Sequence, residues 1–167
     1  MDVATPTRAV VRRLGRPGDL GWVVMAHGEL YATEFGWDTS FEALVAQIVA
    51  GYAADHDPAR EAAWIAEIDG RRVGCVFCVA GDDEVTAKLR ILLVDPAGRG
   101  HGLGRRLVDR CLEFARDAGY RRMTLWTTDV LVSARNIYRA AGFELVEQEH
   151  HRSFGHDLLG QYWSRDL

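Results

Sequence analysis

A glycine-rich stretch in the middle of the chain carries the clearest chemical signal. Gly100, Gly102 and Gly104 alternate with larger residues, between an apolar segment that stops at Asp95 and a helical pattern that begins near Leu103. Alternating glycines let the backbone approach a ligand closely, because no side chain stands in the way. The unpaired N–H groups and the dipole of a helix N-terminus favour an anion. The stretch therefore predicts a pyrophosphate-binding turn between a strand and a helix.

The spacing of this stretch distinguishes between known phosphate-binding motifs. A P-loop ends in Gly-Lys followed by Ser or Thr, whereas here Gly104 is followed by Arg105 and Arg106. A dinucleotide fingerprint needs a glycine where Arg105 stands. The pattern R-x-x-G-x-G, from Arg99 to Gly104, instead resembles the coenzyme A signature of the GNAT superfamily of N-acetyltransferases. A strand-to-helix turn without a ligand is the alternative.

A second motif lies further along the chain, between Ala134 and Phe143. It resembles an element of the same superfamily in which an asparagine, a tyrosine and a Gly-Phe pair follow one another. The resemblance implies that Asn136 contacts the pantetheine arm and that the Tyr138 hydroxyl protonates the departing thiolate. On a short helix these two side chains lie nearly opposite one another, so they would contact different parts of a long ligand. A packed tyrosine with a satisfied hydroxyl is the alternative for Tyr138.

The resemblance also assigns the contacts to acetyl-CoA, which we expect as the co-substrate. In the superfamily a bulge on the strand before the glycine loop frees backbone N–H groups, which polarise the thioester and pair with the pantetheine amides. Pro96 fits the end of such a strand, because proline cannot donate to a ladder. The residues expected to bind the co-substrate are Leu92, Leu93, Val94, Arg99, Gly100, His101, Gly102, Leu103, Gly104, Arg105 and Asn136.

No carboxylate stands where many members of the superfamily carry their general base. This chain offers Lys88 and Arg90 there, and these cations could hold a carboxylate on an amino acid or a peptide terminus. Pairing with Glu84 and the nearby aspartates is the alternative. Glu34, in an aromatic segment expected to line the acceptor pocket, is the first candidate base. His156 is the second, because imidazole takes up a proton near neutral pH, and water relays also serve in the superfamily.

The histidines and cysteines lack the arrangement of a metal site. The segment His150–Asp157 is rich in histidine, but no other element offers a matching set of ligands, so we expect no metal ion. Cys75 and Cys78 have C-x-x-C spacing, yet alternation along a strand would point the two thiols to opposite faces. Buried, unreactive cysteines are therefore expected.

Composition and charge restrict the class of protein further. The chain has 167 residues, which predicts a single domain over residues 1–167. Its net charge of −4 argues against a general nucleic-acid binder, which would be basic. No signal peptide or apolar run of membrane length is visible, so we expect a cytoplasmic protein without membrane contact. Members of the superfamily are often dimers, and a homodimer stays open.

The hydrophobic pattern predicts the elements that must position these residues. We expect an α/β fold: a mixed, mostly antiparallel central sheet with a parallel centre and helices on both faces, as in the GNAT fold. An aromatic, irregular segment is expected over Leu30–Trp37, and a His-rich loop between the last two strands. The expected strands are Val10–Leu14, Ala63–Ile68, Arg72–Val79, Val85–Val94, Met123–Thr127, Phe143–Glu147 and Leu158–Trp163. The expected helices run from Leu20 to about Gly28 with Asp19 as N-cap, from the cap Ser40 to Tyr52, from Leu103 to Ala118 and from Ser133 to Ala141.

Over its whole length the chain resembles the acetyltransferase half of bacterial proteins that join a MarR-type regulator to a GNAT domain. The stretches Leu20–Val24, Tyr31–Trp37 and Ser153–Leu158 carry that likeness, and no segment reads as a DNA-recognition helix. We therefore expect an acetyl-CoA-dependent N-acetyltransferase that acts on the primary amine of a small molecule or amino acid. Acetylation of a protein or peptide is the alternative within the class. A non-catalytic acyl-CoA sensor for a regulator partner is the alternative outside it.

Overall fold

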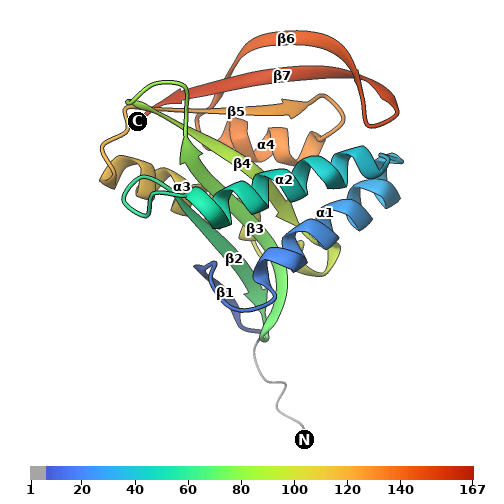
Figure 1. The fold of residues 1–167 in the computed structure, drawn as a ribbon, viewed down its shortest axis with the longest axis horizontal. Helices are drawn as coiled ribbons and strands as arrows, with labels where there is room; N and C mark the ends of the chain where they lie inside the picture. Colours follow the sequence, from blue (N-terminus) through green and yellow to red (C-terminus); the bar gives the residue numbers. More distant parts are fainter. Residues whose placement is uncertain (1–6) are drawn as a thin grey trace, which may run out of the picture.

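The computed structural model describes residues 7–167, which form a seven-stranded sheet flanked by four α-helices (Figure 1). The strand order across the sheet is β1-β2-β3-β4-β5-β7-β6. β4 and β5 are parallel, and every other neighbouring pair is antiparallel. The expected mixed α/β sheet with a parallel centre and helices on both faces is therefore confirmed. Residues 1–6 of the expected domain lie outside the described range.

The elements follow one another in the order that the sequence pattern predicts. The strands are β1 (Ala9–Arg13), β2 (Ala62–Ile68), β3 (Arg71–Ala80), β4 (Thr86–Val94), β5 (Arg122–Thr128), β6 (Glu144–Ser153) and β7 (His156–Asp166). The helices are α1 (Asp19–Phe35), α2 (Thr39–Asp55), α3 (Leu103–Asp117) and α4 (Val132–Ala140), with a short 3₁₀ helix η1 (Pro96–Gly98) between β4 and α3.

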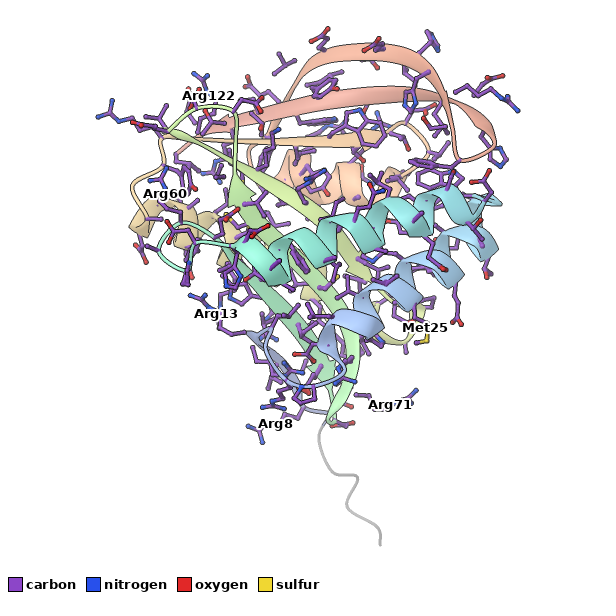
Figure 2. All side chains as sticks on the ribbon, viewed as in Figure 1. Arg8, Arg13, Met25, Arg60, Arg71 and Arg122 are labelled. Atoms are coloured by element: carbon purple, nitrogen blue, oxygen red, sulfur yellow. The ribbon has the colours of Figure 1, made fainter. Side chains whose placement is uncertain are left out.

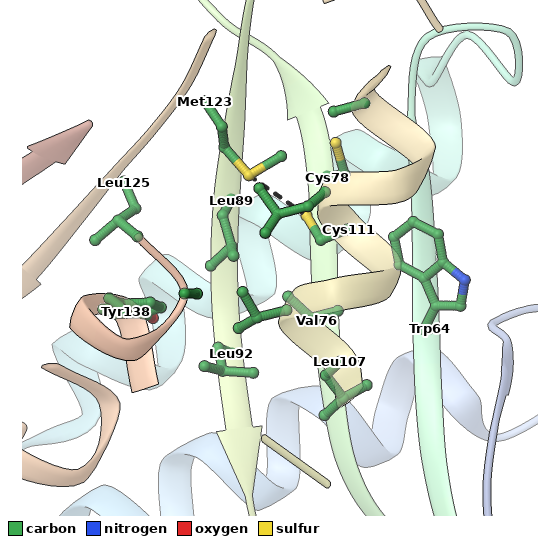
Figure 3. Packing of buried hydrophobic residues seen from close by; sticks show 14 of the residues in the cluster. Trp64, Val76, Cys78, Leu89, Leu92, Leu107, Cys111, Met123, Leu125 and Tyr138 are labelled. Atoms are coloured by element: carbon green, nitrogen blue, oxygen red, sulfur yellow. Dashed lines mark hydrogen bonds between the residues drawn. The ribbon is translucent and has the colours of Figure 1, made fainter. Parts of the chain in front are cut away.

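Two apolar cores lie on the two faces of the sheet. α1 and α2 cover one face, while α3 and α4 cover the other, where Leu107 and Cys111 of α3 pack against β2, β3 and β4 (Figures 1 and 3). Strand alternation divides the C-x-x-C pair between them: Cys75 lies in the α1–α2 core and Cys78 in the α3–α4 core. Both thiols are buried and free, as the strand pattern predicts.

α1 is longer than the sequence indicates. The expected end near Gly28 is wrong: the helix continues through this glycine, where an added Cβ would meet only the flexible side chain of Glu42 of α2. The aromatic segment expected to be irregular continues the helix through Phe35, and Gly36, at φ 69°, ends it. Burial of the aromatic face favours the extra turns, since Tyr31 stacks on Trp37 with ring centroids 5.2 Å apart.

A buried carboxylate anchors the start of α1 to the sheet. Asp19 is fully buried, and its oxygens accept hydrogen bonds from Arg12 of β1 at 2.9 Å and from Arg72 of β3 at 2.8 Å. Burial alone would raise the pKa of Asp19, but the bonds from Arg12, from the Gly15 amide and from Arg72 hold that pKa well below its ordinary value. This contact ties the first residue of α1 to β1 and β3.

The last two strands form a long hairpin where a His-rich loop was expected. β6 and β7 pair up to Ser153 and His156, and Phe154 and Gly155 make the turn at positive φ. β6 is an edge strand whose side chains are mostly exposed, so its sequence shows no alternation of apolar and polar residues. The start of α2 also differs from the expectation. Asp38 caps this helix by accepting a hydrogen bond from the Ser40 amide at 3.0 Å.

The described residues show neither a membrane-spanning helix nor a cluster of metal ligands. No α-helix among residues 7–167 is both long and apolar enough to span a bilayer. In the same part of the chain no three His, Cys, Asp or Glu side chains are grouped as metal ligands would be. The arginines labelled in Figure 2 lie around the periphery in that view rather than in one patch: Arg8, Arg13, Arg60, Arg71 and Arg122.

Candidate active site

A bulge in β4 opens the centre of the sheet. β4 pairs with β5 only over Thr86–Lys88, so its second half diverges from β5. The register with β3 shifts at the same place, and Ile91 adopts a positive φ of 45°. The predicted alternation along β4 therefore breaks: Leu89 and Leu92 face the α3–α4 core, whereas Leu93 faces the α1–α2 core. The bulge and the diverging strands match the expectation for the Leu92–Val94 segment.

The glycine loop joins the open end of β4 to α3. Asp95 caps η1 by accepting from the Ala97 amide at 2.8 Å. Gly102 is the N-cap of α3, and its φ of 65° is a backbone conformation that favours glycine. Because glycine has no side chain, no side chain at this position caps the helix. Gly98 is needed for space, because a Cβ there would lie 2.9 Å from Cβ of Val73. The first amides of α3 are thus left open to an anion.

A groove of about 320 Å³ runs along this loop. The end of α1 forms one wall through Tyr31 and Glu34, and the start of α4 forms another. Arg99, at the mouth, forms an ion pair with Glu34. The predicted co-substrate residues that line the groove are Leu92, Leu93, Val94, Arg99, Gly100, Gly102, Leu103, Gly104 and Arg105.

Two predicted contacts lie outside the lining of this groove. His101 is exposed, and its Nδ1 lies 3.1 Å from the carbonyl oxygen of Arg99. Asn136 is also exposed, and its side-chain oxygen accepts from Arg139 at 3.4 Å. The helix period explains this position, because the face of α4 that meets the groove carries Ala134 and Ile137, with Asn136 turned away. The structure therefore does not bring Asn136 to the groove.

A second, larger cavity of about 630 Å³ lies between the sheet and the α1–α2 layer. It shares lining residues with the groove, so the two spaces meet. Register places its floor on one face of the sheet: Lys88 pairs with Thr124, and Trp126 pairs with Tyr162. The residues common to both spaces are Tyr31, Leu92, Leu131 and Ala134.

Tyr138 lies in the wall of this cavity, on the inner side of α4 (Figure 3). It is 5 % exposed, and its ring packs edge-on against Phe143. Burial raises the pKa of Tyr138 well above its ordinary value, and Tyr31 and Cys111 nearby raise it further. The hydroxyl therefore stays protonated at neutral pH, as a proton donor must.

The two residues predicted as candidate bases lie elsewhere. Glu34 lines the groove, where it pairs with Arg99, and is absent from the lining of the second cavity. His156 sits at the tip of the β6–β7 hairpin, with Nε2 3.0 Å from the carbonyl oxygen of Gly36. Both positions follow from elements that the sequence pattern did not predict, namely the extended α1 and the long hairpin.

Other titratable side chains line the cavity in their place. His27 is 1 % exposed; its Nδ1 lies 2.7 Å from the Val23 carbonyl oxygen, and its Nε2 is buried without a partner among residues 7–167. Burial lowers the pKa of His27 to about 4. Glu149 and His151 of β6 complete this set. His27 already shows helical spacing in the sequence, whereas the latter two are hidden in the unpatterned edge strand.

Arg90 is a cation of the cavity floor that forms no ion pair with residues 7–167. Lys88 next to it pairs with Asp82 at 3.1 Å. None of the ion pairs among the described residues includes Arg90. Burial lowers the pKa of Arg90 below its ordinary value, although a guanidinium stays charged at neutral pH. Of the two cations expected on the acceptor side, Lys88 is therefore engaged by Asp82, whereas Arg90 is available to an anionic ligand.

Fold and site together combine a sheet opened at a bulge, a glycine loop with a groove along it, and a second cavity beside them. The sequence matches the Acetyltransferase (GNAT) family over residues 24–143. The chain therefore belongs to the GNAT acetyltransferase family. This confirms the family resemblance on which the motif assignments rest.

Curated relatives are similar to about half of this chain. Human N-acetyltransferase 8B is 36 % identical over 89 residues, which are 51 % of this chain and 39 % of the relative. N-acetylaspartate synthetase of Danio rerio is 36 % identical over 83 residues, which are 50 % of this chain and 29 % of the relative. The matched region thus spans well under half the length of these relatives.

Solved structures share the fold over nearly the whole chain. The structure of yncA from Salmonella typhimurium, with its cofactor acetyl-CoA, has a TM-score of 0.77 at 19 % identity and covers 95 % of this chain and 94 % of its own. A ribosomal-protein-alanine N-acetyltransferase from Brucella melitensis has a TM-score of 0.75 at 18 % identity, with coverage of 95 % and 99 %. At these identities the likeness establishes the fold alone.

Proposed function

We propose that the chain transfers the acetyl group of acetyl-CoA to the primary amine of a small molecule that carries a carboxylate, such as an amino acid. The observation that carries the proposal is the meeting of two spaces at bulged β4. The groove along the glycine loop fits a long phosphorylated ligand, and the second cavity holds a free cation, Arg90. Tyr138 lines the second cavity, and Leu92 lines both spaces.

The groove residues would hold the co-substrate through several kinds of contact. The open amides of α3 and Arg105 face the pyrophosphate, and the diverging half of β4 offers backbone groups to the pantetheine amides, like an added strand. Glu34 takes a new part in this proposal, as the partner that orients Arg99 at the groove mouth. His101 and Asn136, turned away from the groove, are left out of the binding set.

The residues at the meeting point divide the chemistry between them. A backbone N–H of the Leu92–Val94 segment polarises the thioester carbonyl, a contribution typically worth about 3–4 kcal/mol. The amine nitrogen forms the new bond to the carbonyl carbon while the carbon–sulfur bond breaks. Tyr138 gives its proton to the leaving sulfur, and the proton released by the amine restores the phenol. The products are an amide and a free thiol.

The proposal favours a small acceptor over a peptide because of the walls of the cavity. Aromatic side chains of α1 and α2, and residues of the β6–β7 hairpin, line the acceptor side and leave less room for a peptide. The finer likeness to MarR-type regulator fusions stays a prediction, as does the sensor hypothesis that goes with it. The family match covers residues 24–143. We propose that the described sheet and helices, which include this region, act as one domain.

The test compares acceptors that differ only in the carboxylate, for example leucine and leucinamide, by release of the coenzyme A thiol. A guanidinium–carboxylate contact is worth about 1.5–3 kcal/mol, so the acid is expected to have a kcat/KM about 10- to 100-fold higher. Arg90→Gln removes that preference, and the matched control Arg122→Gln, an exposed arginine paired with Asp166 at 3.4 Å, keeps it. Equal rates for acid and amide would refute the carboxylate assignment.

A further inference from the structure

Two large aromatic side chains are exposed inside the second cavity. Trp126 of β5 is 40 % exposed and Tyr162 of β7 is 44 % exposed, and both line the cavity floor. They are direct cross-strand partners, so their side chains lie on the same face of the sheet. Indole and phenol rings bury a large apolar area when they pack against another group. In this cavity much of that area is left exposed to a ligand.

Gly160 makes room for this aromatic surface. A Cβ at Gly160 would lie 2.9 Å from Nε1 of Trp126 and 3.0 Å from Cδ2 and Nε2 of His151. The rings of Trp126 and His151 can therefore both lie over β7, and their centroids are 5.3 Å apart. Nδ1 of His151 is 2.8 Å from the Ser153 hydroxyl, which fixes the imidazole in place. The glycine, the tryptophan and the histidine thus form a platform in which the two rings are inclined at 50° to one another.

The opposite side of the cavity is apolar as well. α2 contributes Phe41, Leu44 and Ile48 to the lining, above the platform. Arg90, on the adjacent strand β4, faces the same cavity. A ligand that spans from Arg90 to the platform would therefore need an anion at one end and a large apolar group at the other.

We infer that the acceptor is an amino acid with a large apolar or aromatic side chain, which stacks on Trp126 and Tyr162 while its carboxylate contacts Arg90. This inference rests on the proposed function, because it names the substrate class of the same cavity. The volume of about 630 Å³ exceeds what a small acidic amino acid needs. A second carboxylate would lie against the rings of Trp126 and Tyr162, which offer it no positive charge, and this disfavours aspartate as the acceptor.

The experiment measures kcat/KM for alanine, aspartate, leucine, phenylalanine and tryptophan by thiol release. We expect phenylalanine and tryptophan to exceed alanine by at least about 10-fold, as apolar pockets discriminate between large and small side chains. In Trp126→Ala and Gly160→Ala the ratio of phenylalanine to alanine falls about 10-fold, because the platform is removed or displaced. Val146→Ala, an exposed residue of β6 outside the cavity lining, keeps the wild-type ratio.

Binding of the products gives a readout that does not depend on turnover. By calorimetry with coenzyme A present, we expect the wild type to bind N-acetylphenylalanine more tightly than N-acetylalanine. In Trp126→Ala the difference between these two affinities should be smaller. Unchanged affinity of each variant for acetyl-CoA shows that it is folded.

The outcomes separate this inference from the proposed function. Amino acids acetylated with no preference for apolar side chains, or with aspartate preferred, would overturn the inference and leave the proposed function standing. A preference that survives in both Trp126→Ala and Gly160→Ala would also overturn it. Acetylation of amines regardless of a carboxylate would refute the carboxylate assignment, and the inference with it.

Discussion

At the scale of single residues, the site depends on side chains whose environment sets their charge. Tyr138 and Tyr31 are held protonated by burial, and Arg90 stays a lone cation at the cavity floor. Glu34 and Arg99 neutralise one another at the groove mouth. In the proposed function, Tyr138 is the proton donor and Arg90 the anion site of the second cavity, and the groove along the glycine loop takes the phosphates.

Tyr138→Phe tests the proton donor directly. Loss of a general acid typically lowers the rate about 10²- to 10⁴-fold, so kcat should fall within that range. Because Tyr138 is absent from the groove lining, the affinity for acetyl-CoA should stay within about twofold of the wild type. Steady-state kinetics and calorimetry measure the two quantities, and unchanged turnover in the variant would remove Tyr138 from the mechanism.

At the scale of elements, the sequence predicts the layers well and the edges poorly. The central strands and α3 have strong periodicity, and their positions are confirmed, as is the bulge expected near Leu92. The end of α1 differs from the prediction because the packing of its aromatic face, which favours the extra turns, is not visible in the sequence pattern. The hairpin was missed because an exposed edge strand needs no apolar alternation. Glu34 and His156 lie on these two elements, so the sequence pattern did not predict their positions outside the second cavity, and their role as bases stays a prediction.

Gly98→Ala tests how η1 supports the groove. The added methyl group would press on Val73 and on Val94, both held in the sheet, and overpacking of this kind typically costs about 1–3 kcal/mol. We expect a lower free energy of unfolding in urea and weaker acetyl-CoA binding. Gly51→Ala is the matched control: its Cβ meets nothing within 4 Å in α2, so it should stabilise by about 1 kcal/mol and leave binding unchanged. Equal effects of the two variants would contradict the packing role.

At the scale of the whole molecule, two cores and their buried polar groups set stability. His27 is neutral in the folded chain because burial lowers its pKa from 6.5 to about 4. Unfolding exposes the ring, which can then take up a proton below about pH 6.5. Stability from this group is therefore complete above that pH, declines as the pH falls to about 4, and declines no further below it.

His27→Leu should flatten this part of the pH profile. The shift of the His27 pKa corresponds to about 3 kcal/mol of unfolding free energy between pH 6.5 and 4. Urea denaturation at a series of pH values measures it, with His150→Asn, an exposed histidine of β6, as the control that keeps the wild-type slope. If His27→Leu and the wild type lose stability in parallel over this range, the histidine is not the cause.

Acetyl-CoA binding at the glycine loop is the central claim, and a calorimetric titration tests it most directly. We predict one site per chain in the wild type, lost in the double variant Arg99→Glu, Gly102→Glu, which places two carboxylates at the anion site. Arg121→Glu, outside the groove lining, is the charge-reversal control and should bind like the wild type. A well-folded wild type that shows no binding, or a double variant that binds equally well, would contradict the assignment of the groove.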